Sequence, residues 1–196
     1  MTIKYYTIGM AGHIDHGKTT LTKALSGIDT DTLKEEKARK ITIEPGFAPF
    51  PLTKDLHTSI VDVPGHEKLI RQMIAGVAGI DLVLLVIAGD EGVMPQTREH
   101  FEILSYLGIE KGIIVVTKSD MIDEEMRFLV EEDILELTNS SVFEHFPIHF
   151  VDSVSSAGIE KLKNEIINLL RDTPVKSSQG AFRMPIDHIF KVKGQG

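Results

Sequence analysis

Short apolar runs alternate with helix-length amphipathic segments along most of this chain, and this alternation limits the fold more than any other feature. The brevity and β-branched content of the runs favour strands of a parallel sheet. Strict alternation of strand and helix predicts a doubly wound α/β layer. We predict strands at residues 5–10, 59–63, 82–87, 113–116 and 148–151, and helices at 19–25, 67–75, 96–107, 124–137 and 159–170.

Length and composition predict one well-packed domain with a short extra segment. The chain has 196 residues, of which 42% are hydrophobic and 26% charged, which is typical of a globular protein. The net charge of −8 argues against a broad surface for nucleic acid phosphates. Cysteine is absent, which excludes disulfides and thiolate metal sites. No apolar run approaches the roughly 20 residues of a membrane span, so we expect a soluble, cytoplasmic protein.

The carboxyl-terminal part differs in pattern from the rest. Residues 1–172 carry the strand and helix alternation, and residues 173–180 are polar and contain proline and glycine, as linkers do. In residues 181–196 apolar and polar residues begin to alternate, as in a strand of an all-β unit. One such strand cannot bury its own apolar face. We therefore expect a fragment of a longer protein, truncated within a β-barrel domain.

Residues 12–19 read G-H-I-D-H-G-K-T and match the phosphate-loop pattern G-x-x-x-x-G-K-[ST]. The motif follows the first predicted strand and opens the first helix, where backbone N–H groups can surround phosphates. Lys18 would reach the β and γ oxygens, and the Thr19 hydroxyl would bind Mg²⁺. An accidental glycine-rich turn and a histidine metal site are the alternatives. The predicted phosphate-binding residues are His13, Ile14, Asp15, His16, Gly17, Lys18, Thr19 and Thr20.

A second acidic site follows the strand at residues 59–63. Asp62 stands at the end of this strand, where a carboxylate can support the Mg²⁺ shell. The amide of Gly65 could then bond a γ-phosphate, and the neighbouring His66 could orient the attacking water. Taken alone, a histidine after Pro-Gly is more often a solvated loop residue. Next to a phosphate loop and Asp62, we predict that His66 is catalytic.

The strand at residues 113–116 leads into T-K-S-D, Thr117 to Asp120. A carboxylate there can accept two hydrogen bonds from N1 and N2 of guanine, which adenine cannot donate, while the Lys118 stem lies along the base. A polar strand end that caps the next helix is the alternative, and ATP is the alternative ligand. One strand later, backbone amides of a serine-led loop could meet guanine O6. The predicted guanine-binding residues are Thr117, Lys118, Asp120, Ser153, Val154 and Ser155.

With G-H-I-D-H-G-K-T, D-V-P-G-H-E, T-K-S-D and a serine-led loop in this order, the chain resembles the GTP-binding domain of translational GTPases related to elongation factor Tu. The resemblance covers nearly the whole chain. Within that group it is most similar to the selenocysteine-specific elongation factors. Residues 31–36, 41–48, 90–97 and 182–187 carry this closer similarity.

The resemblance implies a P-loop NTPase with a mostly parallel, doubly wound sheet of six strands flanked by helices. It also implies that Thr42 is the second side-chain ligand of Mg²⁺ and that Asp15 contributes to a site for a monovalent cation. Ile14 and Ile41 match apolar residues that screen the catalytic histidine until the ribosome moves it. Two positions depart from the wider family: Thr117 replaces Asn, which could weaken a brace on the phosphate loop, and Lys40 replaces Gly.

Three functions follow. The first, implied by the resemblance, is a monomeric GTPase that carries selenocysteyl-tRNA to the ribosome, where the sarcin-ricin loop positions His66. The second is another translational factor, such as initiation factor 2 gamma or a general elongation factor, that binds a different aminoacyl-tRNA. The third is a regulatory GTPase without tRNA binding. All three predict GTP or GDP with Mg²⁺ as ligands.

Overall fold

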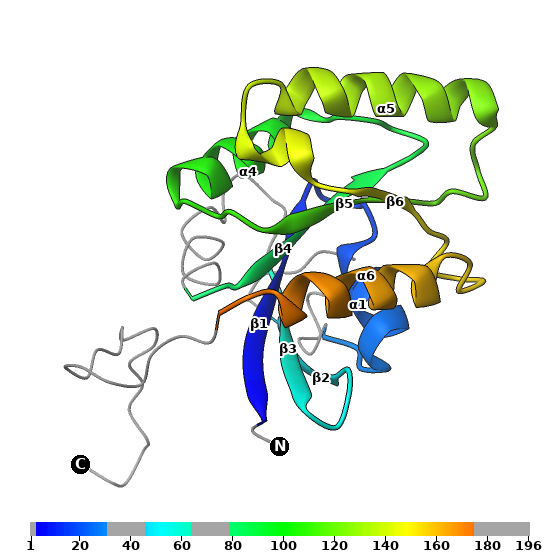
Figure 1. The fold of residues 1–196 in the computed structure, drawn as a ribbon. Helices are drawn as coiled ribbons and strands as arrows, with labels where there is room; N and C mark the ends of the chain where they lie inside the picture. Colours follow the sequence, from blue (N-terminus) through cyan, green and yellow to red (C-terminus); the bar gives the residue numbers. More distant parts are fainter. Residues whose placement is uncertain (1–2, 31–45, 64–78, 175–196) are drawn as a thin grey trace, which may run out of the picture.

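Six strands form a single sheet in the order β2-β3-β1-β4-β5-β6 (Figure 1). The computed structural model describes residues 3–30, 46–63 and 79–174. All strand pairs are parallel except β2 with β3, which run antiparallel. The predicted six-stranded, mostly parallel sheet is therefore confirmed. The strands are β1 (Lys4–Gly12), β2 (Gly46–Pro51), β3 (Leu56–Asp62), β4 (Leu82–Ala88), β5 (Gly112–Thr117) and β6 (Ile148–Phe150).

Helices cover both faces of the sheet, as doubly wound folds require. Side chains of α1 and α6 pack in one apolar cluster with the sheet, and side chains of α4 and α5 pack in a second. Figure 1 shows α6 and α1 together on one side of the strands. The helical elements are α1 (Lys18–Ser26), α4 (Pro95–Tyr106), α5 (Glu124–Thr138), the 3₁₀ helix η2 (Val142–His145) and α6 (Ile159–Arg171).

The central strand β4 shows why its sequence is continuously apolar. All seven of its residues are buried, because successive side chains point to opposite faces and both faces are covered. Leu84 and Val86 belong to the cluster with α1 and α6, whereas Leu85 and Ile87 belong to the cluster with α4 and α5. The sheet thus holds the ends of its strands rigidly, and those ends position the site.

Local chemistry explains where α4 and α5 begin. Pro95 stands in the first turn of α4, where its missing N–H costs nothing. Asp123 is the N-cap of α5, and its side chain accepts a hydrogen bond of 2.9 Å from the Met126 amide. The helix predicted at 67–75 lies outside the described residues. Among the helices that the structure describes, none is long and apolar enough to cross a membrane.

The sequence analysis did not place β2, although the expected strand number included it. Its residues Gly46–Pro51 contain two prolines, which cannot donate ladder hydrogen bonds. An edge strand tolerates them, and β2 lies at the edge beside β3. The predicted domain boundary at 172 lies one residue beyond the end of α6, and the Tyr6 hydroxyl donates to the carbonyl of Thr173. The strand predicted within 181–196 lies outside the described residues.

Candidate functional site

The predicted site residues come together at one edge of the sheet. Because β1, β3, β5 and β6 run parallel, their carboxyl ends share that edge, which is where open α/β sheets bind ligands. β1 leads into the phosphate loop, β3 ends at Asp62, β5 leads into residues 117–120, and β6 precedes residues 153–155 (Figure 1). Of the predicted residues, Thr42, Gly65 and His66 lie outside the described part of the chain.

The first position of the phosphate loop has a backbone conformation that only glycine can adopt. Gly12 has φ of +138°, and a Cβ atom there would lie 2.1 Å from the carbonyl oxygen of Val86. Asp15 and Gly17 also have positive φ, and Gly17 is the N-cap of α1. Turns of this kind next to a helix N-terminus direct N–H groups toward a common point. The predicted anion cradle is consistent with this local geometry.

Two side chains fix the loop by donating hydrogen bonds to its carbonyl groups. The Thr117 hydroxyl donates a 2.7 Å hydrogen bond to the carbonyl of His16, and both residues are buried. Thr117 therefore braces the phosphate loop although it replaces the usual Asn. Within the loop, the Lys18 ammonium donates a 2.6 Å bond to the His13 carbonyl. This places the ammonium at the loop, where it can exchange that carbonyl for phosphate oxygens.

Helix α4 holds the loop through two further side chains. The Gly12 amide donates a 2.9 Å hydrogen bond to Nδ1 of His100, and the Ile14 amide donates a 3.3 Å bond to Oε1 of Gln96. The Ile14 amide is thus engaged by a side chain, although the sequence analysis placed this residue among those that bind phosphate. Sequence analysis missed both partners, because neither is near the loop in the chain.

Asp62 is fully buried at the end of β3. The Thr30 hydroxyl donates a 2.9 Å hydrogen bond to Oδ2 of this carboxylate and thereby fixes its orientation. Gly46 leaves room for Thr30, since a Cβ there would lie 2.6 Å from the Thr30 Cβ. A hydroxyl on Thr19 and a carboxylate on Asp62 are hard oxygen ligands, which suit Mg²⁺.

Mg²⁺ needs few protein ligands when phosphates supply the others. In the described ranges, no group of three or more His, Asp or Glu side chains could hold a metal ion by itself.

The segment that we predict to bind the base, residues 117–120, begins at the carboxyl end of β5. Lys118 has φ of 53°, and its ammonium lies 3.0 Å from Oδ1 of Asp90 and 2.9 Å from Oε1 of Glu91. Burial lowers the pKa of Lys118, but the hydrogen bonds that its ammonium donates to Glu91 and Asp90 outweigh it and raise the pKa above its ordinary value. Asp120 is exposed and can receive a base.

The loop after β6 is organised by a carboxylate that the sequence analysis missed. Asp152 is buried and accepts hydrogen bonds from the amides of Val154, at 2.8 Å, and Ser155, at 2.9 Å. The side-chain hydrogen bond of Ser155, together with these two amide bonds, lowers the pKa of Asp152. Two of the three amides proposed for guanine O6 are therefore engaged within the loop. The third residue, Ser153, has a buried hydroxyl oxygen for which the described residues supply no partner.

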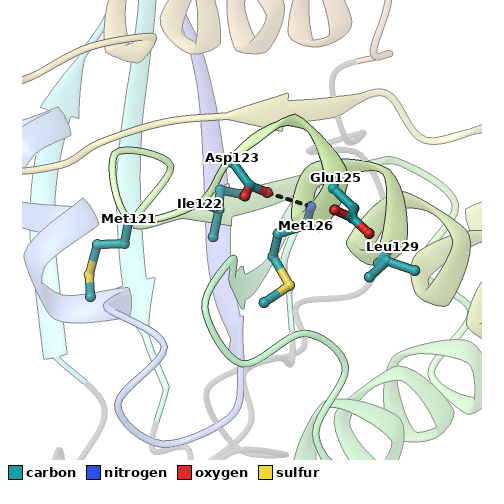
Figure 2. Close-up of a pocket in the computed structure, with 6 residues that line it drawn as sticks. All are labelled: Met121, Ile122, Asp123, Glu125, Met126 and Leu129. Carbon is teal, nitrogen blue, oxygen red and sulfur yellow. Dashed lines mark hydrogen bonds between the residues drawn. The ribbon is translucent and has the colours of Figure 1, made fainter.

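The residues that follow Asp120 line a shallow hollow of about 250 Å³ at the start of α5. Figure 2 shows the Asp123 carboxylate bonded to the Met126 amide beside this hollow, which fixes where the helix begins. Ile122 packs toward Gly89, where a Cβ would lie 2.8 Å from the Ile122 Cδ1. The start of α5 is thereby anchored, and with it the position of Asp120.

Two imidazoles are buried against the phosphate loop. Burial, aided by the neighbouring cationic Lys18 and by His13, lowers the pKa of His100 to about 3. Burial also lowers the pKa of His16 to about 4, even though its bond to the Val86 carbonyl acts in the opposite direction. Both side chains are consequently neutral at neutral pH. Protonation of His100 at Nδ1 would remove the acceptor of the Gly12 amide.

Comparison with known proteins gives consistent results. A model of the elongation factor Tu GTP binding domain matches residues 4–172. A selenocysteine-specific elongation factor of Desulfomicrobium baculatum is 50% identical over 96% of this chain. A crystal structure of a bacterial selenocysteine-specific elongation factor superposes with a TM-score of 0.82 at 44% identity, over 88% of this chain. The elongation factor SelB of Methanococcus maripaludis, solved with the GTP analogue GppNHp, gives 0.78 at 33% identity over 90%.

The matched region is only part of those relatives. This chain spans 30% of the length of the Desulfomicrobium factor, 30% of the bacterial crystal structure and 36% of the Methanococcus one. The similarity therefore concerns one domain of proteins that are about three times longer.

The buried histidines predict how stability depends on pH. Below pH 6.5 the unfolded chain binds protons on His16 and His100, whereas the folded chain does not until about pH 4 and about pH 3. The free energy of unfolding should therefore fall as pH falls from about 6.5 to 4, by about 1.4 kcal/mol per pH unit for each histidine.

Urea unfolding at a series of pH values measures this slope. His100→Asn should reduce the slope by about 1.4 kcal/mol per pH unit, since it removes one of the contributing histidines. The matched change at His145, which is exposed, keeps the buried imidazoles and should keep the full slope. An unchanged slope in the His100 variant would show that this imidazole is not held neutral in the folded protein.

Proposed function

Because the chain belongs to the family of elongation factor Tu GTP-binding domains, we propose that it is the GTPase domain of a selenocysteine-specific elongation factor. Membership of this family of translational GTPases implies GTP hydrolysis and the use of GTP, GDP and Mg²⁺. The Thr117 bond to the His16 carbonyl is the observation that carries the proposal, because it joins the base-binding segment directly to the phosphate loop. A guanine nucleotide fits such a site, with its base and phosphates held by neighbouring strand ends.

The phosphate loop binds the nucleotide phosphates through the amides of residues 15–20 and the Lys18 ammonium. The hydroxyls of Thr19 and Thr42 would hold Mg²⁺, with Asp62 in the outer shell, where Thr30 already orients it. When bound, Mg²⁺ neutralises negative charge on the β and γ phosphates. The Gly65 amide bonds the γ-phosphate and is released after hydrolysis, which makes the domain a switch.

His66 orients the water that attacks the γ-phosphate. A neutral imidazole beside the Gly65 amide can accept a hydrogen bond from this water and align it in line with the leaving group. Ile14 and Ile41 screen His66 until the ribosome, through the sarcin-ricin loop, moves it into place. Ile14 is half-buried at the mouth of the loop, consistent with a screening position.

Guanine is selected by Asp120, which accepts hydrogen bonds from N1 and N2 while the Lys118 stem lies along the base. The bonds from Lys118 to Asp90 and Glu91 hold this stem in place. Guanine O6 lies next to Ser153. Asp152 fixes the shape of this loop by accepting hydrogen bonds from the two amides that follow Ser153. The exposed Asp15 carboxylate, presented on a residue with φ of 60°, contributes to a monovalent cation site near the phosphates.

The intact factor delivers selenocysteyl-tRNA to the ribosome as a cytoplasmic monomer. Residues 1–172 form the GTPase domain, 173–180 the linker and 181–196 the start of a β-barrel domain. With a net charge of −8, the chain is poorly suited to bind RNA over a broad surface, so other domains make most of the tRNA contacts.

Replacing Asp120 by Asn tests the base assignment. An amide can no longer accept both guanine N–H groups but can donate to the C2 oxygen of xanthine. We expect GDP affinity to fall roughly 10-fold to 100-fold, as for loss of hydrogen bonds to a charged group, and xanthosine diphosphate affinity to rise. The same change at Asp123, the α5 N-cap, serves as the control. Equal GDP to xanthosine diphosphate ratios in both variants would refute the role of Asp120.

Replacing His66 by Ala tests the catalytic assignment. GTP affinity should remain within a factor of about two, because the phosphates and base keep their contacts. Ribosome-stimulated hydrolysis by the intact factor should fall about 100-fold or more, as for loss of a group that positions a reacting proton. His145→Ala, at an exposed position on η2, should leave turnover unchanged. Undiminished turnover in the His66 variant would remove it from the mechanism.

Binding of aminoacyl-tRNAs by the intact GTP-bound factor tests the cargo. We expect selenocysteyl-tRNA to bind more tightly than the same tRNA charged with serine, and GDP to weaken the binding. Preference for initiator tRNA would instead identify an initiation factor 2 gamma-like protein. Equal binding of all elongator tRNAs would indicate a general elongation factor, and absence of tRNA binding a regulatory GTPase.

A further inference from the structure

Helix α4 contacts the phosphate loop through side chains one helical turn apart. Gln96 and His100 are separated by four residues and so lie on the same face of α4. His100 accepts the 2.9 Å hydrogen bond from the Gly12 amide, and Gln96 accepts the 3.3 Å bond from the Ile14 amide. The helix therefore holds two alternate amides of the loop before the chain turns toward the phosphates.

The bond between Gly12 and His100 fixes the chemical state of the imidazole. An amide N–H can only donate, so Nδ1 of His100 must be unprotonated and the ring proton must lie on Nε2. His100 is 1% exposed, and burial keeps its pKa near 3, so the neutral form persists. Nδ1 of His100 therefore stays available as an acceptor at neutral pH.

The Gly12 amide needs an acceptor because the residue is buried, and His100 supplies one. The carbonyl oxygen of Val86 lies so close to Gly12 that no side chain fits there. A buried amide without an acceptor costs about 1–3 kcal/mol. Without His100, the loop would relieve this cost by moving away from its present shape.

We propose that His100, assisted by Gln96, is a positioning residue that holds the phosphate loop in the shape that binds the diphosphate of the nucleotide. The same stretch of chain reaches the base subsite, because Asp90 and Glu91, just before α4, hold Lys118. Residues 90–100 therefore contact both halves of the site. Only the identity of the ligand rests on the proposed function; the bond itself does not.

The effect on binding follows from the fraction of protein in the competent shape. If the loop leaves this shape in most molecules, the apparent dissociation constant rises by the inverse of the remaining fraction. For His100→Leu, which removes the acceptor, we expect GDP and GTP affinities to fall by the same factor, about 5-fold to 50-fold. His100→Asn should restore most of the affinity, because its amide oxygen can occupy the position of Nδ1.

The functional test compares these two variants with the wild-type chain and with His145→Leu, by fluorescence titration with labelled GDP and GTP. Thermal unfolding confirms that each variant is folded. Lower affinity in His100→Leu, recovery in His100→Asn and no change in His145→Leu support the proposal. Equal affinity of the wild type and a folded His100→Leu variant would overturn it, as would equal losses in the leucine and asparagine variants.

A second measurement needs neither a variant nor a nucleotide. In the ¹⁵N-labelled wild-type chain, a scalar coupling between the Gly12 amide nitrogen and Nδ1 of His100 reports the hydrogen bond directly. We expect this coupling, with Nδ1 unprotonated at pH 7. A protonated Nδ1 or an absent coupling overturns the inference in a protein that binds GDP normally. Failure of the wild type to bind GDP at all overturns the proposed function instead.

Discussion

The phosphate loop is partly buried, and the rest of the site depends on which groups form hydrogen bonds with its backbone. Loops usually stay on the surface because buried N–H and C=O groups need partners. Here other elements supply them: α4 accepts from Gly12, and β5 donates to the His16 carbonyl through Thr117. The imidazole of His16, in the loop itself, donates a hydrogen bond to the Val86 carbonyl of β4. The sheet and α4 thus determine the loop's shape independently of a ligand.

The same constraint explains the order of the elements. A loop fixed by β4, β5 and α4 must lie where these elements meet, at the carboxyl edge of the sheet. Asp62 arrives at this edge on β3, which pairs directly with β1. Lys118 and Asp120 follow the carboxyl end of β5, which lies two strands from β1. A preorganised cradle of this kind binds its ligand without the cost of ordering the loop.

The segment predicted to bind the base is held by carboxylates, whereas the phosphate loop is held through its own backbone groups. Asp90 and Glu91 hold the Lys118 ammonium, and Asp152 gathers the amides of its own loop. These acidic groups carry part of the negative net charge of the chain. The Lys118 ammonium stands between Asp90 and Glu91 and keeps its charge, which offsets part of theirs.

Local patterns in the sequence predicted what local forces determine. The apolar runs and helical periodicities gave five of the six strands and all four described α-helices, because burial of both sheet faces dictates these patterns. The phosphate loop and T-K-S-D were recognisable because their chemistry is confined to a few consecutive residues. The prolines of β2 hid an edge strand, since an edge position is a property of the sheet and not of the segment.

The partners that support the site could not be predicted in the same way. The hydrogen bonds of His100 and Thr117 join residues that are 88 and 101 positions apart, and no spacing rule links such pairs. In the sequence, His100 is one polar residue among others of an amphipathic helix. Only the fold brings its Nδ1 within hydrogen-bonding distance of the Gly12 amide. Thr117 was expected to weaken the brace, but a hydroxyl reaches the same carbonyl at 2.7 Å.

Calorimetric titration of this chain with GTP, GDP and ATP, each with and without Mg²⁺, tests most directly whether the strand ends form a guanine nucleotide site. We expect GTP and GDP to bind, Mg²⁺ to strengthen the binding of GTP, and ATP to give no measurable heat. ATP binding as tight as that of GTP would contradict the roles of Lys118 and Asp120, and with them the assignment of the domain as a translational GTPase.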